Sequence, residues 1–252
     1  MTVVKKKKTS KLFRFLRWLL GLVYPKFSAE GTEKIPDEPV IFVANHCHAH
    51  GPLVGEYYMP RAPYAWCAGE MMHLKTVPAY AFRDFWGYKP KWIRWFYRLL
   101  SYLIAPLAVV VFNNARTIGV YHDTRVLSTF KKTVEHLAEG DSVLIFPEHD
   151  ADHNHIVCDF QDKFIDVAKL YHKRTGKAVA FVPLYIAPNL KCQYVGEPIR
   201  YDPTQPMETQ RRVICDYLMD AITELACNLP EHTVIPYRNV AKKYYPSNLK
   251  KE

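Results

Sequence analysis

Short apolar runs rich in β-branched and aromatic residues alternate along this chain with segments in which apolar residues recur every three or four positions. The short runs predict buried strands over residues 40–44, 64–68, 142–146 and 178–186. The periodic segments predict helices over residues 126–137, from Phe160 to near Gly176, and over residues 207–226. Strands that alternate with helices indicate an α/β fold with a largely parallel central sheet flanked by helices. Such sheets carry their functional sites at the carboxyl ends of strands.

The first 28 residues form a distinct basic and apolar segment. Residues 1–29 hold eight Lys or Arg and no acid, whereas the rest of the chain has 26 bases and 25 acids, so the net charge of +9 belongs almost entirely to this segment. Its apolar run is interrupted by Arg14 and Arg17, is too short to span a bilayer, and is not followed by a signal-peptide cleavage site. We therefore expect residues 1–28 to form a basic amphipathic helix in the membrane interface. A solvated tail that leads into a core helix is the alternative.

A second apolar run covers residues 99–112 and contains Pro106. Its length is commoner in a buried helix or a half-inserted segment than in a membrane span. Bases interleaved with Trp92 and Trp95 precede it, which is a mixture typical of lipid headgroup regions. The run therefore fits either a membrane contact or a wall of the protein core.

Composition and charge exclude several classes of protein. A chain of 252 residues with 49% hydrophobic content can bury a full core, and without repeats or linkers residues 29–252 are expected to form one α/β domain. The nearly neutral body of the chain argues against a nucleic-acid partner. Six scattered cysteines without a C-x-x-C pair indicate reduced thiols in a cytosolic setting. We expect a peripheral or monotopic protein on the cytoplasmic face of a membrane, and the sequence predicts no oligomeric state.

Two polar clusters follow two of the predicted strands. The first strand continues into NHCHAHGPL, which begins at Asn45, and the 142–146 strand continues into PEHDADHNH, which begins at Pro147. Six of the eleven histidines lie in these two short stretches. Because both stretches follow carboxyl ends of strands, we expect them to face one cleft.

The motifs around these clusters resemble those of the glycerolipid acyltransferases, which make or remodel phosphatidic acid and related lipids. The first family motif, N-H-x-x-x-x-D followed by P-L, resembles ANHCHAHGPL, with Gly51 in place of the Asp. The third, F-P-E-G-T-R, resembles the segment that begins with Phe146, Pro147 and Glu148 and then departs at His149. An apolar strand with V-P-L at residues 181–186 is similar to the fourth motif. The order and spacing cover roughly residues 35–200.

The resemblance implies a catalytic role for His46. In the family, the motif His takes the proton of the acceptor hydroxyl as that hydroxyl attacks a thioester carbonyl, and the Asp holds the imidazole in position. Gly51 cannot orient the ring, so we expect His50, Glu148, Asp150 or Asp152 to take over that role. A carboxylate restored at position 51 would then be expected to raise the rate, unless the glycine backbone excludes it.

The acceptor-binding residues depart further from the family pattern. TIGVYH, residues 117–122, is similar to the family's I-P-V-x-R strand, with Gly119 in place of Pro and His122 in place of Arg. Ala151 replaces the Arg of the third motif. By resemblance, the substrate-binding residues would be Asn45, Gly51, His122, Phe146, Pro147, His149 and Arg116. The loss of both arginines favours an acceptor whose headgroup is not a bare phosphate, such as an aminolipid or glycolipid.

The resemblance implies acyl transfer from acyl-CoA or acyl carrier protein, as a thioester co-substrate, to a lysophospholipid, glycerolipid or related hydroxyl acceptor, with no cofactor and no metal. Two alternatives come from other classes. Six imidazoles and three carboxylates at two strand ends are also ligand types of a metal-dependent hydrolase, although no complete metallohydrolase signature is present. A catalytically silent lipid-binding homologue is the other alternative, because the motif Asp is lost.

Overall fold

The computed structural model describes residues 9–121 and 123–249, which divide into two compact units. The first comprises Met1–Pro25 and Cys67–Tyr121, and the second comprises Lys26–Trp66 and His122–Glu252. The first unit thus combines the N-terminal helix with a long internal segment of the chain.

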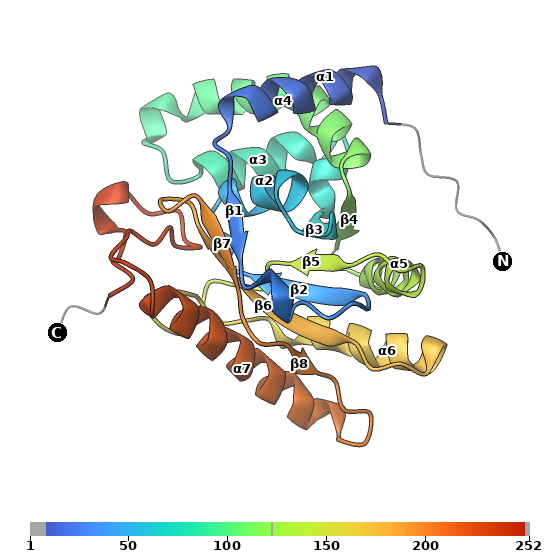
Figure 1. Ribbon diagram of the computed structural model, residues 1–252. Helices are drawn as coiled ribbons and strands as arrows, with labels where there is room; N and C mark the ends of the chain where they lie inside the picture. Colours follow the sequence, from blue (N-terminus) through green and yellow to red (C-terminus); the bar gives the residue numbers. More distant parts are fainter. Residues whose placement is uncertain (1–8, 122, 250–252) are drawn as a thin grey trace. The chain divides into compact units, whose positions relative to one another are not determined.

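The second unit is built on a mixed, mostly parallel sheet (Figure 1). Its strands are β1 (Ser28–Glu30), β2 (Val40–Ala44), β3 (Tyr64–Ala68), β5 (Val143–Ile145), β6 (Ala180–Ala187), β7 (Cys192–Val195) and β8 (Ile199–Arg200), with the last two residues of β3 in the first unit. The strand order is β1-β7-β6-β2-β5-β3, and β8 pairs with β6. The pairs β2–β5, β2–β6, β3–β5 and β1–β7 are parallel, whereas β6 pairs antiparallel with β7 and β8. This arrangement confirms the α/β fold with a largely parallel sheet.

The core of this unit lies around the two central strands. Every residue of β2 and of β6 is buried, as expected for strands covered on both faces. Pro183 is tolerated inside β6 because it lies where the antiparallel neighbour changes, with Phe181 paired to β8 and Leu184 paired to β7. On the parallel side, Pro183 is in register with Val43 of β2.

Helices connect and cover these strands. They are α2 (His50–Tyr57), α5 (Val126–Ala138), α6 (Asp166–Thr175) and α7 (Met207–Cys227), with short 3₁₀ turns η1 (Thr32–Lys34), η4 (Asp162–Ile165) and η5 (Lys242–Tyr244). α7 packs against β6, and α5 packs against α6. The Arg211 guanidinium of α7 forms two hydrogen bonds with the Asp166 carboxylate of α6, at 2.7 and 2.9 Å. α6 ends at Gly176, whose φ of 72° provides the left-handed turn that closes the helix.

Most elements predicted from the apolar pattern are present. The strands over 40–44 and 64–68 have the predicted bounds, and the helix predicted over 207–226 extends one residue further. The predicted helix start at Phe160 is wrong, because Phe160 forms an isolated β-bridge with Glu148 and the helical turn begins at Asp162. Helical spacing alone did not reveal that Phe160 is buried as part of this bridge rather than on a helix face.

The first unit is mainly helical and carries the N-terminal segment. Its elements are α1 (Lys11–Val23), η2 (Gly69–Met72), α3 (Val77–Trp86), η3 (Lys91–Ile93), α4 (Arg94–Asn114) and β4 (Thr117–Val120). The Ser10 hydroxyl caps α1 by accepting from the Phe13 N–H at 3.1 Å, and the Ser10 N–H donates to Asn114 Oδ1 at 2.8 Å. α3 and α4 pack around a small apolar core of Met71, Val77, Ala81 and Ala105.

Candidate active site

The loop that follows β2 is fastened to the neighbouring strand by Asn45. The buried Asn45 amide donates to the Ile186 carbonyl at 3.0 Å and accepts from the Ile186 N–H at 2.7 Å. Both halves of the side chain are thus engaged with the β6 backbone. This pair of bonds fixes the point at which the chain leaves the sheet and places His46 directly at the carboxyl end of β2.

The loop turns sharply after His46. Cys47 and His48 have φ angles of 37° and 55°, in the left-handed region that costs non-glycine residues roughly 1 kcal/mol or more each. The Gly51 N–H donates to the His46 carbonyl at 3.2 Å and closes the turn. A Cβ atom at Gly51 would collide with that carbonyl and lie 2.9 Å from the Phe146 ring. Gly51 is therefore needed for close packing, not for an unusual φ angle.

The His46 imidazole is held between two aromatic rings. Phe146, at the end of β5, lies 5.2 Å away between ring centroids at an interplanar angle of 68°, and Tyr237 lies 6.0 Å away at 89°. Among the residues that the structure describes, neither ring nitrogen of His46 has a hydrogen-bond or ion-pair partner. Burial of the ring, with a smaller effect of the neighbouring His48, lowers the pKa of His46 to about 4.

Glu148 supports the loop through the main chain. Its carboxylate accepts from the His46 N–H at 2.7 Å and from the Cys158 N–H at 2.9 Å, and the residue is 4% exposed. Burial raises the pKa of Glu148 to about 7, against the opposing effect of the two backbone hydrogen bonds. Both carboxylate oxygens are used, so Glu148 ties the β2 loop to the β5 loop rather than orienting the imidazole.

The remaining polar residues of the second cluster turn to separate partners. The His149 ring lies 3.6 Å from the Asp159 carboxylate, and its backbone N–H donates to the Asp159 carbonyl at 3.0 Å. Asp150 and Asp152 both pair with Arg238. The His153 ring lies 4.0 Å from Asp220, and the His155 ring is bonded to the Asn248 carbonyl at 3.0 Å. The two clusters therefore meet through Glu148 and the aromatic rings, and their imidazoles do not converge.

Residues from the C-terminal segment complete the site and were not anticipated from the sequence. We call residues 233–249, the red segment beyond α7 in Figure 1, the C-terminal strap. Tyr237 contacts the His46 ring, the Arg238 carbonyl is bonded to His48 Nε2 at 3.3 Å, and the Tyr245 ring lies 6.2 Å from that of His48. The strap's aromatic and basic residues were a signal in the sequence, but nothing in the pattern showed what they would contact.

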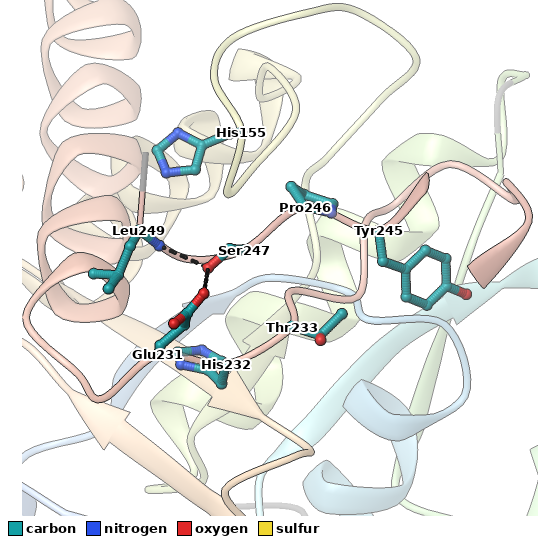
Figure 2. Close-up of a pocket in the computed structure, with 8 residues that line it drawn as sticks. All are labelled: His155, Glu231, His232, Thr233, Tyr245, Pro246, Ser247 and Leu249. Carbon is teal, nitrogen blue, oxygen red and sulfur yellow. Dashed lines mark hydrogen bonds between the residues drawn. The ribbon is translucent and has the colours of Figure 1, made fainter. Parts of the chain in front are cut away.

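Two open pockets border the strap. One, of about 490 Å³, is lined by His48, Ala49, His50, Asn189, Thr233, Ile235, Lys242 and Tyr245. Burial, then the neighbouring His48, lowers the pKa of His50 in this pocket. The other pocket, of about 730 Å³, is shown in Figure 2 and shares Thr233 and Tyr245 with the first. His46 is not among the residues that line these two pockets.

The pocket in Figure 2 contains Ser, His and Glu side chains that do not form a nucleophile and base pair. The Ser247 hydroxyl donates to Glu231 at 3.4 Å and accepts from the Leu249 N–H at 3.3 Å. The buried His232 ring is bonded to the Tyr185 hydroxyl and the Pro230 carbonyl, both at 2.8 Å. The bond between Ser247 and Glu231 joins the strap to the segment that precedes it, and the His232 ring holds that segment against β6.

Other residues expected to bind substrate lie in different surroundings. Pro147 is buried, and its carbonyl accepts from the Gln161 N–H at 3.0 Å. Arg116 precedes β4 in the first unit. His122 lies outside the described residues.

A cluster of possible metal ligands lies elsewhere in the second unit. Across residues 9–121 and 123–249, the group whose ligand atoms all lie within 4.8 Å of one another is His136, Glu139 and Asp141, at the end of α5. The His136 ring stacks on Tyr64 with centroids 3.6 Å apart, and its Nδ1 lies 3.4 Å from the Asp141 carboxylate. None of these residues belongs to the two loops at the strand ends.

No protein-family model and no curated protein sequence matches the chain. Among solved structures, it is similar to the 1-acyl-sn-glycerophosphate (LPA) acyltransferase PlsC from Thermotoga maritima, with 16% sequence identity and a TM-score of 0.48. The similarity covers 87% of this chain and 80% of that one.

The first unit exposes large apolar side chains on two helices. On α1 they are Leu12, Phe15, Trp18, Leu19, Leu20, Leu22 and Val23, and on α4 they are Trp95, Phe96, Leu99, Tyr102, Leu103 and Leu107. Ser101 and Ala105 of α4 are buried, and Ala105 belongs to the apolar core that α4 shares with α3, so residues 99–112 pack one face inside the unit and expose apolar side chains on another. Within the described residues, one helix, Lys91–Asn114, is long and apolar enough to cross a membrane, by length and composition.

Proposed function

We propose that this protein is an acyltransferase that moves a fatty acyl group from a thioester donor to the hydroxyl group of a lipid acceptor. The observation that carries the proposal is the position of His46. It follows the carboxyl end of a buried parallel strand within an N-H…P-L motif, and Glu148 of an F-P-E segment holds its backbone. In this class of sheet, strand ends carry catalytic groups.

The reaction follows from general base catalysis. A neutral His46 nitrogen accepts the proton of the acceptor hydroxyl while the hydroxyl oxygen attacks the thioester carbonyl. The new C–O bond forms, the C–S bond breaks, and the departing sulfur takes the proton back from the imidazolium. The lowered pKa of His46 keeps the ring neutral at physiological pH, as a base requires, but makes it a weaker base than an imidazole paired with a carboxylate. The mechanism uses acyl-CoA or acyl carrier protein as co-substrate and requires no metal.

We propose that the protein works at an anionic membrane surface, on the cytoplasmic face. The exposed apolar residues of α1 and α4 support this, because large apolar side chains gathered on exposed helices are typical of a lipid or protein contact. Arg14 and Arg17 lie among the apolar residues of α1 and would meet anionic headgroups. The basic run at residues 5–8 lies outside the described residues.

An assay of the purified full-length protein tests the proposal. Acyl-CoA and acyl carrier protein donors are each offered with a panel of acceptors that includes lysophosphatidate, zwitterionic lysophospholipids and glycolipids, in vesicles. We expect acyl transfer to at least one acceptor, with release of the donor thiol in equal amount. Thiol release without an acylated lipid would indicate a hydrolase. If no acceptor in the panel is acylated, the proposal is contradicted.

A catalytically silent lipid-binding homologue is the second candidate. It is favoured by one observation, the lack of a polar partner for the His46 ring within the described residues. Under this alternative the protein would bind lysolipid vesicles and show no turnover. The convergence of imidazoles that a metal-dependent hydrolase would need at these loops is not seen among the described residues.

A further inference from the structure

The two contacts of the His46 ring come from different parts of the chain. Phe146 belongs to the strand end that faces the β2 loop, whereas Tyr237 lies in the C-terminal strap, outside all of the sequence motifs. The rings meet the imidazole edge-on, at interplanar angles of 68° and 89°. Aromatic pairs prefer such edge-to-face geometry and contribute about 0.5–1.5 kcal/mol beyond the area they bury.

The strap is attached at several residues that follow Tyr237 in the chain. The next residue, Arg238, pairs through its guanidinium with Asp150 and with Asp152, and its carbonyl is bonded to His48, two residues after His46. Further along, Tyr245 contacts His48, and the buried Asn248 side chain donates to the Ala226 carbonyl at 2.8 Å and accepts from the His232 N–H at 2.8 Å. Tyr237 is thus fixed against both loops that form the site.

We propose that Tyr237 is a positioning residue for His46, and that Arg238 holds it there by bridging the strap to the 150–152 loop. This inference rests on the proposed function. A carboxylate orients an imidazole by a hydrogen bond, whereas two ring edges restrict its rotation sterically. The strap therefore takes over the orienting part of the role that Gly51 cannot perform. It supplies no charge to stabilise the imidazolium.

The ion pairs of Arg238 lie at the protein surface and are individually weak. The Asp150 and Asp152 side chains are 79% and 89% exposed, and exposed ion pairs are worth about 0–1 kcal/mol each. Removal of the anchor should therefore loosen Tyr237 without releasing it completely. This ordering of effects distinguishes a positioning role from general destabilisation.

The test compares Tyr237→Ala, Tyr237→Phe and Arg238→Ala in the full-length protein, with Tyr244→Ala as a control on the same strap. Tyr244 is 66% exposed and has no place in the site. One readout is the titration of the His46 imidazole by NMR, assigned with a His46 variant, which needs no activity. The other is kcat and KM for acyl transfer.

We expect Tyr237→Ala to raise the pKa of His46 from about 4 towards its ordinary value, as water reaches the ring, and to lower kcat about 10- to 100-fold with a smaller change in KM. Tyr237→Phe and Tyr244→Ala should leave both readouts near wild type. Arg238→Ala should change both in the direction of Tyr237→Ala, by less.

Three results would overturn the inference. An unchanged His46 titration in Tyr237→Ala would show that the strap does not enclose the ring. Equal effects of Tyr237→Phe and Tyr237→Ala would show that the Tyr237 hydroxyl, and not its ring, acts on His46. If His46 titrates in Arg238→Ala as it does in the wild type, Arg238 does not hold Tyr237 in place. If the protein transfers no acyl group at all, the proposed function fails, while the NMR arm still decides whether the strap positions the ring.

Discussion

The Glu148 carboxylate accepts a hydrogen bond from the backbone N–H of His46 at 2.7 Å. Glu148 therefore holds the main chain of the candidate base and not its ring. The second oxygen of Glu148 is occupied by the Cys158 N–H, so one buried side chain joins the loops after β2 and β5. This relationship explains why an acid is needed in the F-P-E segment even if it never touches substrate.

Glu148→Gln should destabilise the protein. A Gln side chain has one acceptor oxygen, and its NH₂ group would face a backbone N–H that has lost its partner. An unsatisfied buried group costs roughly 1–3 kcal/mol, and we expect a loss of that order in the free energy of unfolding, measured by urea denaturation. Glu197→Gln is the control, since Glu197 is 67% exposed and pairs with Lys34 at the surface. Equal stability of the two variants would mean that Glu148 does not hold the loops.

The pH dependence of stability should separate Glu148 from His46. Burial raises the pKa of Glu148 from 4.5 to about 7, so between these values the folded protein keeps a proton that the unfolded chain releases, and stability falls as pH rises. Burial lowers the pKa of His46 from 6.5 to about 4, so over nearly the same interval the unfolded chain keeps the proton, and stability rises with pH. Each contribution is on the order of 3 kcal/mol, and in the wild type they oppose each other.

The two contributions can be separated by replacing Glu148 and His46 one at a time and measuring the free energy of unfolding in urea at pH 5 and pH 7. Relative to wild type, Glu148→Gln should gain more stability, or lose less, on going from pH 5 to pH 7, because the His46 term remains. His46→Gln should change in the opposite direction. Other groups titrate alike in all three proteins. Parallel profiles for both variants and the wild type would contradict the burial of these two groups.

A carboxylate introduced at Gly51 should not restore the usual partner of His46. Its Cβ would collide with the His46 carbonyl, so Gly51→Asp and Gly51→Ala should both lower stability and transfer rate, in contrast to the gain expected from motif comparison. The steric cost is common to both variants, and overpacking of this kind costs about 1–3 kcal/mol. Gly176→Ala is the control, with a φ of 72° and no atom within 4 Å of its Cβ. It should cost about 1–2 kcal/mol and leave the transfer rate unchanged. A higher rate in Gly51→Asp would mean that the loop opens to admit the side chain.

Membrane attachment should depend on α1. We expect Phe15→Ser, Trp18→Ser and Leu22→Ser combined to release the protein from anionic vesicles in a flotation assay, because these side chains are 55%, 59% and 63% exposed. Leu127→Ser with Leu170→Ser, which removes exposed apolar residues from the second unit, should bind as wild type does. Added salt should weaken binding of the wild type through its basic residues. If the triple variant stays bound independently of salt, α4 is the main attachment.

The sheet was predictable because its central strands are continuous apolar runs. Val40–Ala44 and Tyr64–Ala68 contain no charged or amide side chain that would interrupt the apolar run, and both are strands with the predicted bounds. β7 was missed because the polar Gln193 interrupts its apolar pattern. Gln193 is buried in the structure, where its side-chain amide donates a hydrogen bond to the Tyr58 carbonyl at 2.5 Å. Local patterns contain no information about such a distant partner.

The site was predictable to the level of its loops. Strand ends and motif order placed His46, Phe146 and Glu148 in neighbouring loops, and the structure brings these three together. The backbone role of Glu148 and the tie between His48 and Arg238, 190 residues apart, depend on tertiary packing. Tyr237 could not be assigned from the sequence for the same reason.

The most direct test of the central claim is the rate of acyl transfer by His46→Ala, measured as acylated lipid and released thiol with the donor and acceptor that the wild type uses best. Circular dichroism and urea unfolding verify that the variant is folded. If His46 is the general base, the rate should fall about 10²- to 10⁴-fold. Wild-type turnover by a folded His46→Ala protein would contradict the proposed mechanism.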